Sequence, residues 1–154
     1  MGMDRDIFDL VMGLPGFKML EPFYLKHKEG LLYLFFGGLT FLVSVASYGL
    51  FNIVCGLNEL LANILSWFIA VYFAYMTNRN YVFRVKYNDV RRHFRQMSDF
   101  FSARVLTLLL EELILFLFIT RLDFSSMVVK VGAQFVVIVT NYILSKLYIF
   151  KKVN

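Results

Sequence analysis

Long apolar stretches and short polar segments alternate along the chain. No charged residue occurs in residues 30–58 or in residues 60–78. Because a helix rises about 1.5 Å per residue, about 20 apolar residues are enough to cross the hydrocarbon of a bilayer. The pattern therefore predicts spanning helices near residues 31–54 and 60–78, joined by a tight turn.

The end of the chain predicts another span, near residues 127–150. Lys130 and Lys146 lie close to its two ends, where long side chains can extend to the polar membrane surface. Composition agrees with a membrane location, because 59% of the 154 residues are hydrophobic and 18% are charged. A soluble domain of this size cannot bury so much apolar surface.

Residues 100–120 form the least obvious span, because Arg104, Glu111 and Glu112 interrupt them. The alternative is an amphipathic helix of a soluble protein. However, the residues on either side of the two glutamates are apolar all round, which is not typical of a surface helix. We therefore predict an all-α polytopic membrane protein with four transmembrane helices in residues 30–154.

Residues 1–29 have a different pattern. Between residues 4 and 26, apolar side chains such as Ile7 and Leu10 mix with acids such as Asp4, and Pro15 interrupts the segment. This mixture predicts an amphipathic segment that lies in the membrane interface. Its apolar stretches are too short for a cleavable signal peptide.

The basic residues indicate the orientation in the membrane. Most of them lie before the first span, between the second and third spans, or at the end of the chain, and the first predicted turn has none. Since lysine and arginine favour the cytoplasmic side, both termini are predicted to be cytoplasmic, in a cytoplasmic (inner) membrane. The net charge of +5, distributed in this way, favours contact with a membrane surface over nucleic acid.

The two halves of the sequence resemble each other. Residues 75–84 match residues 142–151 without a gap, with basic, aromatic, aliphatic, phenylalanine and basic positions in register. Residues 35–38 match residues 100–103 more weakly, with two aromatic residues before two small ones. Because each half has two spans, the halves share one orientation and predict two parallel repeats of a helical hairpin.

Three motifs resemble the GtrA-like family, over about residues 33–152. They are Tyr33-Leu-Phe-Phe-Gly-Gly-Leu-Thr-Phe-Leu-Val43, Asn78-Arg79-Asn-Tyr-Val-Phe83 and Asn141-Tyr-Ile-Leu-Ser-Lys146-Leu-Tyr-Ile-Phe150. Ser44 and Ala74 stand where family members often have asparagine. The resemblance implies movement of a polyprenyl-phosphate-linked sugar across the membrane, for cell-surface polysaccharide or wall-polymer glycosylation. It also implies a membrane glycosyltransferase as a partner.

Ionisable residues inside a span are energetically costly and therefore mark candidate functional residues. Glu111 and Glu112 lie about 16 Å from the cytoplasmic start of the third span, near the middle of the membrane. Arg104 lies on the same helix face as Glu111, two turns earlier. The fourth span has a polar stripe at helical spacing, formed by Lys130, Gln134 and Asn141.

We interpret these side chains as a path for a phosphate-sugar headgroup. Arginine and lysine are suited to phosphate, and the candidates are Arg104, Lys130, Arg79 and Lys146. The polar residues that would meet sugar hydroxyls are Glu111, Glu112, Gln134 and Asn141, and Asn78 joins the candidates through its motif. The alternative interpretation is that the charges pair with one another and hold the helices together.

Three functions remain open. The first is translocation of the lipid-linked sugar, and the second is a non-transporting anchor or scaffold for a glycosyltransferase. The third is proton-coupled export of hydrophobic cations through Glu111 or Glu112, which the basic polar face disfavours. An enzyme is not expected. The paired carboxylates Glu111 and Glu112 point about 100° apart on a helix, so they cannot flank one bond as the two acids of a glycosidase do. No metal or other cofactor is expected, and homo-oligomer formation stays open.

The predicted topology can be tested by thiol labelling. Cysteines introduced at Asn58 and Ser125, in a Cys55→Ala background, should react with a membrane-impermeant reagent in intact cells. The reason is that both residues lie in turns predicted to face outward. A cysteine at Asn88 should stay protected, and labelling there instead of at the turns would show the opposite orientation.

Overall fold

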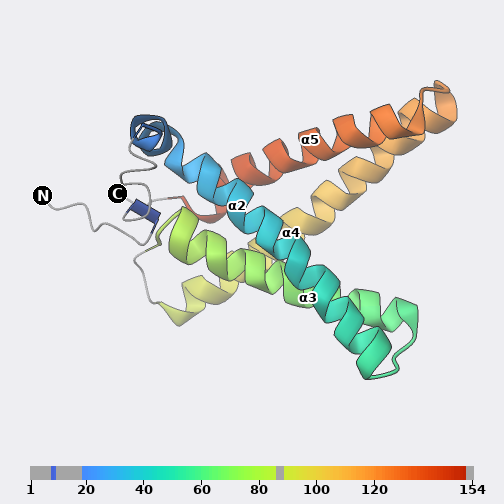
Figure 1. Cartoon of the computed structure of the whole chain (residues 1–154), viewed down its shortest axis with the longest axis horizontal. Helices are drawn as coiled ribbons and strands as arrows, with labels where there is room; N and C mark the ends of the chain where they lie inside the picture. Colours follow the sequence, from blue (N-terminus) through green and yellow to red (C-terminus); the bar gives the residue numbers. More distant parts are fainter. Residues whose placement is uncertain (1–7, 10–18, 86–88, 152–154) are drawn as a thin grey trace, which may run out of the picture.

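The computed structural model describes residues 8–9, 19–85 and 89–151, and within them it contains helices and no strand (Figure 1). Four long helices each continue into a π-helical segment. They are α2 (Glu21–Gly49) with η1 (Leu50–Val54), α3 (Glu59–Thr77) with η2 (Asn78–Val82), α4 (Val90–Leu115) with η3 (Phe116–Arg121), and α5 (Ser126–Leu144) with η4 (Ser145–Ile149). The predicted all-α class is confirmed.

Two helices begin earlier than predicted. A proline in the first turn starts α2 at Glu21 rather than near residue 31, because proline is favoured where its missing N–H is not needed. The Asp89 side chain caps α4 by accepting a hydrogen bond from the Arg91 N–H, so that α4 starts ten residues before the predicted residue 100. The predicted interfacial segment, with its break at Pro15, lies mostly outside the described residues.

Three helices in the described residues are long and apolar enough to cross a membrane. They are Glu21–Val54, Glu59–Val82 and Val128–Ile149. The sequence predicted four spans, and the one that is not among these three is α4. It is long enough to cross a membrane but has Arg104, Glu111 and Glu112 in its apolar half. The chain is therefore a multi-pass membrane protein whose third helix has three charged residues in its apolar half.

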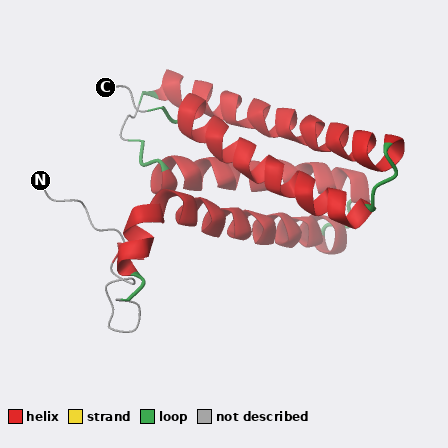
Figure 2. Cartoon of the chain, turned by 90° about the horizontal axis from the view of Figure 1, so that it is seen from above, coloured by secondary structure: helices red, strands yellow, loops and turns green. Residues whose placement is uncertain are grey.

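The helices pair as two antiparallel hairpins, α2–α3 and α4–α5 (Figures 1 and 2). The connections after η1 and η3 lie at one end of the molecule, which we call the turn end. The starts of α2 and α4, together with η2 and η4, lie at the other end, the terminal end. Both hairpins thus point the same way, and the predicted parallel repeat is confirmed.

Corresponding positions of the repeat also share unusual backbone geometry. Adding 67 to the residue numbers of η2 (78–82) gives η4 (145–149). The same shift relates Gly56 to Asp123, the positive-φ residues of the two turns. Because positive φ is rare outside glycine, its recurrence supports a duplicated hairpin.

Aromatic rings join the two hairpins at the terminal end. Phe83 stacks on Phe150, its counterpart in the repeat, with ring centroids 5.1 Å apart and an interplanar angle of 19°. The ring centroids of Tyr75 and Phe150 are 5.9 Å apart, and those of Tyr142 and Phe83 are 6.2 Å apart. Each tyrosine thus packs against the phenylalanine of the other hairpin. This reciprocal pattern indicates an approximate twofold axis between the two phenylalanine rings, with one hairpin on either side.

From this aromatic contact the hairpins diverge toward the turn end (Figure 1). The main hydrophobic cluster lies at the terminal end and includes Tyr33, Phe36, Tyr75, Phe100 and Phe150. Side chains toward the turns, such as those of Ile53 and Val128, are largely exposed. In a membrane these side chains contact lipid, so the hairpins need no further contact with each other there.

Phe100→Ala should lower the free energy of unfolding by about 3–5 kcal/mol, the usual cost of deleting a buried phenylalanine. Phe100 is 1% exposed and lies against Tyr75 and Phe150. Reversible unfolding of the purified protein in mixed micelles measures the effect. The control is Phe135→Ala, since Phe135 is 70% exposed. Equal losses for both variants would contradict the packing described.

Candidate functional site

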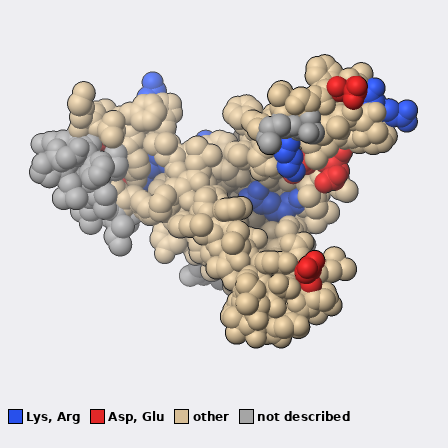
Figure 3. All heavy atoms as spheres, turned by 45° about the vertical axis from the view of Figure 1, so that its right-hand side comes forward, with Lys and Arg blue, Asp and Glu red and all other residues tan. Residues whose placement is uncertain are grey.

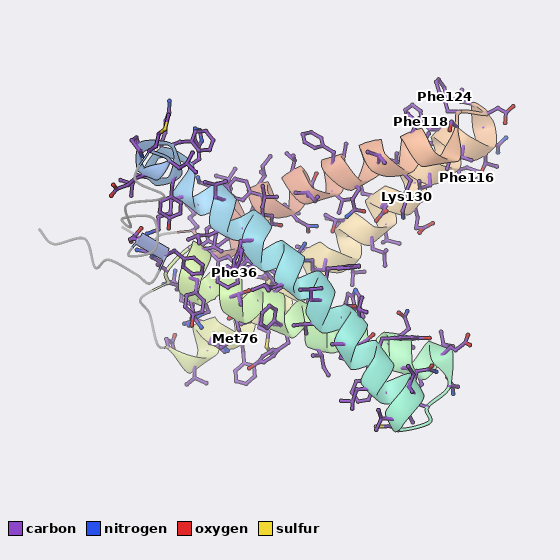
Figure 4. The ribbon with its side chains drawn as sticks, viewed as in Figure 1. Phe36, Met76, Phe116, Phe118, Phe124 and Lys130 are labelled. Atoms are coloured by element: carbon purple, nitrogen blue, oxygen red, sulfur yellow. The ribbon has the colours of Figure 1, made fainter. Side chains whose placement is uncertain are left out.

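Two of the predicted charged residues form an ion pair between α4 and α5. The Lys130 Nζ atom donates a hydrogen bond to Glu111 Oε1 over 2.6 Å. The Glu111 side chain is 11% exposed, whereas that of Lys130 is 55% exposed. Lys130 lies on α5 toward the turn end, while Phe36 and Met76 lie nearer the terminal end (Figure 4). One carboxylate and one ammonium group of the predicted polar stripes thus face each other.

A second polar contact lies closer to the terminal end of the same hairpin. The Thr107 hydroxyl donates a hydrogen bond to the Asn141 amide oxygen over 3.0 Å, and both residues are buried. The sequence analysis did not include Thr107. Its spacing contained the signal, because Thr107 lies three residues after Arg104 and four before Glu111 and so shares their helix face.

The other candidate residues on α4 and α5 take part in neither the Glu111–Lys130 nor the Thr107–Asn141 contact. Glu112 and Gln134 are exposed. Arg104 is partly buried, and its guanidinium group lies 4.8 Å from the centre of the Phe100 ring. Its seven-residue separation from Glu111 corresponds to about 10.5 Å along the helix. Arg104 and Glu111 therefore act as separate groups on one face.

Charged side chains gather where the two hairpins diverge. Figure 3 shows lysine or arginine atoms in the hollow between the two lobes, with acidic and basic atoms beside it on the α4–α5 lobe. A charged side chain is costly in hydrocarbon. These charged groups therefore mark the hollow as a candidate place for a polar ligand.

The remaining predicted residues lie at the terminal end, away from the Glu111–Lys130 pair. Asn78 is 3% exposed, and its amide nitrogen donates to the Ala74 carbonyl oxygen over 2.6 Å. Arg79 is also buried. Both belong to η2, and π-helical segments often occur at functional sites. The sequence motif thus corresponds to an irregular helix end rather than to a loop.

Lys146 joins the two hairpins at the same end. Its Nζ atom lies 3.0 Å from Glu29 Oε1 and 3.2 Å from the Tyr142 hydroxyl. The Tyr142 hydroxyl donates to the same Glu29 oxygen over 3.2 Å. In the other half of the repeat, the Tyr75 hydroxyl donates to the His93 carbonyl oxygen over 3.1 Å. Each tyrosine therefore contacts the first helix of the opposite hairpin, α2 for Tyr142 and α4 for Tyr75.

A cavity of about 860 Å³ opens beside Lys146. Three separate parts of the chain supply its basic side chains: Lys26, Lys28, Arg84, Lys146 and Lys151. The sequence analysis treated most of these residues only as signals of orientation. The repeated motif held a partial signal, because Arg84 and Lys151 occupy its matching final positions. Among the described residues, no cluster of histidine, cysteine and acidic side chains could hold a metal ion.

Residues 32–150 match a family model described as GtrA/DPMS, transmembrane domain. The chain belongs to the GtrA/DPMS family. The match covers all four helices except the start of α2, and it includes both repeated motifs apart from the last residue of the second, Lys151. The resemblance identified from the sequence motifs is therefore confirmed.

Relatives of this GtrA/DPMS protein occur in Listeria and Bacillus. The cell wall teichoic acid glycosylation protein GtcA of Listeria monocytogenes serovar 1/2a is 34% identical over 131 residues, 84% of this chain and 90% of GtcA. The membrane protein YwcD of Bacillus subtilis is 30% identical over 121 residues, 79% of this chain and 95% of YwcD. No solved structure matches the chain significantly.

Thr107→Val should weaken the α4–α5 hairpin by about 0.6–1.7 kcal/mol, the range for hydrogen bonds between membrane helices. The variant leaves the buried Asn141 oxygen without its donor. Mixed-micelle unfolding measures the change. Thr40→Val is the matched control, because the Thr40 hydroxyl bonds only within its own helix, to the Phe36 carbonyl oxygen. A larger loss for Thr40→Val would contradict this assignment.

Proposed function

We propose that the protein moves a polyprenyl-phosphate-linked sugar across the cytoplasmic membrane, for glycosylation of a cell-surface polymer. The observation that carries this proposal is the line of polar groups on α4 and α5, from Thr107–Asn141 to Glu111–Lys130. Membership of the GtrA/DPMS family and similarity to GtcA, which is named for teichoic acid glycosylation, support a role in cell-surface glycosylation.

We infer that α4 also crosses the membrane, as the third of four spans. An arginine or acidic residue costs about 2.5–3.5 kcal/mol at a helix centre on insertion scales, with Glu taken as similar to Asp. The hydrogen bond from Lys130 to Glu111 offsets part of that cost, because it satisfies the charge inside the hairpin. With four spans, the excess of basic residues places both chain ends on the cytoplasmic side.

The headgroup would follow the hollow beside α4 and α5 while its prenyl tail stays in lipid. Arg104 and Lys130 supply cations for the phosphate, because charge-assisted hydrogen bonds to phosphate are strong. Glu112 and Gln134 are exposed and can replace water around the sugar hydroxyls. Glu111 and Asn141 already have partners, so their role is to hold Lys130 and the helix face in place.

A scaffold for a membrane glycosyltransferase is the second candidate. One observation favours it: Glu111 pairs with Lys130, and Asn141 pairs with Thr107, so these polar groups satisfy each other without a ligand. A scaffold needs the helices but not the charges. Replacing a buried ion pair by apolar groups is often neutral or even stabilising, so the two functions predict different outcomes for the charges.

The triple variant Arg104→Leu, Glu111→Gln, Glu112→Gln separates the two functions. We expect it to stay in the membrane and to retain any glycosyltransferase partner, while outer-face sugar transfer falls by about tenfold or more. An increase of about 1.4 kcal/mol in the activation free energy of transport is enough for a tenfold decrease. Lipid-linked sugar should accumulate on the inner leaflet.

Leaflet-resolved measurement of the lipid-linked sugar, beside the outer-face product, tests this expectation. Glu59→Gln is the control, because Glu59 is an exposed acid at the turn end of the other hairpin. Wild-type product levels in the triple variant would favour the scaffold.

A further inference from the structure

The cavity at the terminal end is strongly asymmetric in charge. Five basic residues line it, together with one acid, Glu29, and Asp9 forms an ion pair with one of the five, Lys28. The basic residues come from the start of α2, from the second residue after η2, and from η4 and the second residue after it. Cations that are distant in sequence but share one concave site create a strong positive potential there. Such a site favours an anionic ligand.

The rest of the cavity wall is mainly apolar. The residues that form it are Leu25, Leu32, Val82, Phe83, Leu147, Tyr148 and Phe150. A free phosphate ion would leave this apolar surface exposed to water. A phosphate attached to a long hydrocarbon chain matches both parts, because its headgroup meets the cations while the chain covers the apolar wall and continues into lipid.

We propose that this cavity binds the phosphate group of a prenyl-phosphate lipid on the cytoplasmic side, before the lipid moves between the hairpins. Lys26, Lys146 and Lys151 contact the phosphate oxygens. The identity of the lipid rests on the proposed function, whereas the site itself rests on the cavity. It lies away from the Arg104 and Lys130 side chains and is the place where the lipid is loaded.

Glu29 acts at this site as a competitor of the ligand. Its carboxylate accepts hydrogen bonds from both Lys146 and Tyr142, so it occupies Lys146 when no phosphate is bound. The phosphate replaces the carboxylate as the partner of Lys146, which exchanges one anion for another without leaving the ammonium group unpaired. Removing the negative charge of Glu29 should therefore strengthen phosphate binding.

A second basic depression at the same end provides a comparison. It measures about 480 Å³ and lies at the start of α4, lined by Arg91, Arg92, Arg95 and Lys151 together with Asp89 and Asp99, so that Lys151 lines both cavities. Its two acids halve the formal positive charge of its four basic residues, and its apolar wall is smaller. It therefore fits a lipid phosphate less well, and Arg91 is a suitable control for the general attraction of anions to this surface.

Equilibrium binding of radiolabelled farnesyl phosphate to the full chain in phosphatidylcholine nanodiscs tests the proposal. Lys151→Gln and Lys146→Gln should each weaken binding by about tenfold, as expected for one charge-assisted hydrogen bond. Glu29→Gln should tighten it several-fold, and Arg91→Gln should leave it unchanged. Lys151 is exposed, so its variant remains informative if the Lys146 variant does not fold.

Two further ligands distinguish the sources of the phosphate. Farnesol, which lacks phosphate, should not bind, and inorganic phosphate should compete only weakly. Inorganic phosphate binding as tightly as farnesyl phosphate would overturn the assignment to a lipid. Weaker binding in Glu29→Gln, or equal losses in Arg91→Gln and Lys151→Gln, would overturn the site.

Binding is measured here without transport, so the outcome does not depend on translocation. Specific binding of farnesyl phosphate, combined with normal glycosylation by the triple variant of α4, would keep this site and reject the translocase. Loss of glycosylation in that triple variant, without specific binding at the cavity, would keep the translocase and reject this site.

Discussion

The stacking of Phe83 on Phe150 is the contact on which the arrangement of the two hairpins depends. In lipid, apolar side chains gain little by leaving their solvent, so close packing has to hold membrane helices together. That packing is concentrated at the terminal end, where Tyr75, Phe100 and the two stacked rings meet. Because the hairpins are joined there, they can diverge toward the turns.

The divergence explains where the charges of α4 can lie. A charged residue in the middle of a closely packed four-helix bundle would need a partner for every polar atom. Here Glu111 has Lys130 as a partner from the same hairpin, while Arg104 is partly buried beside Phe100. Figure 3 shows lysine or arginine atoms at the surface of the hollow between the lobes. This hollow is separate from the basic cavity at the terminal end.

Much of this architecture was predictable from local patterns. The gapless match of residues 75–84 with 142–151 predicted the parallel repeat, because a duplicated segment folds under the same local forces each time. The lengths of the uncharged stretches predicted three of the helices. The early starts of α2 and α4 were missed, because Pro22 and Asp89 were not considered as helix-start signals. Helical periodicity predicted the polar stripes to which Glu111 and Lys130 belong, and the structure shows that these two side chains pair.

The sequence by itself determined the helices, their repeat, the family and the polar residues inside the third and fourth helices, because these depend on composition and short-range spacing. Only the tertiary structure decided that Thr107 meets Asn141 and that Glu29 meets Lys146. It also decided that basic residues from three parts of the chain line one cavity. The physical reason is that these contacts join residues far apart along the chain, and the packing of aromatic rings at the terminal end sets their distances.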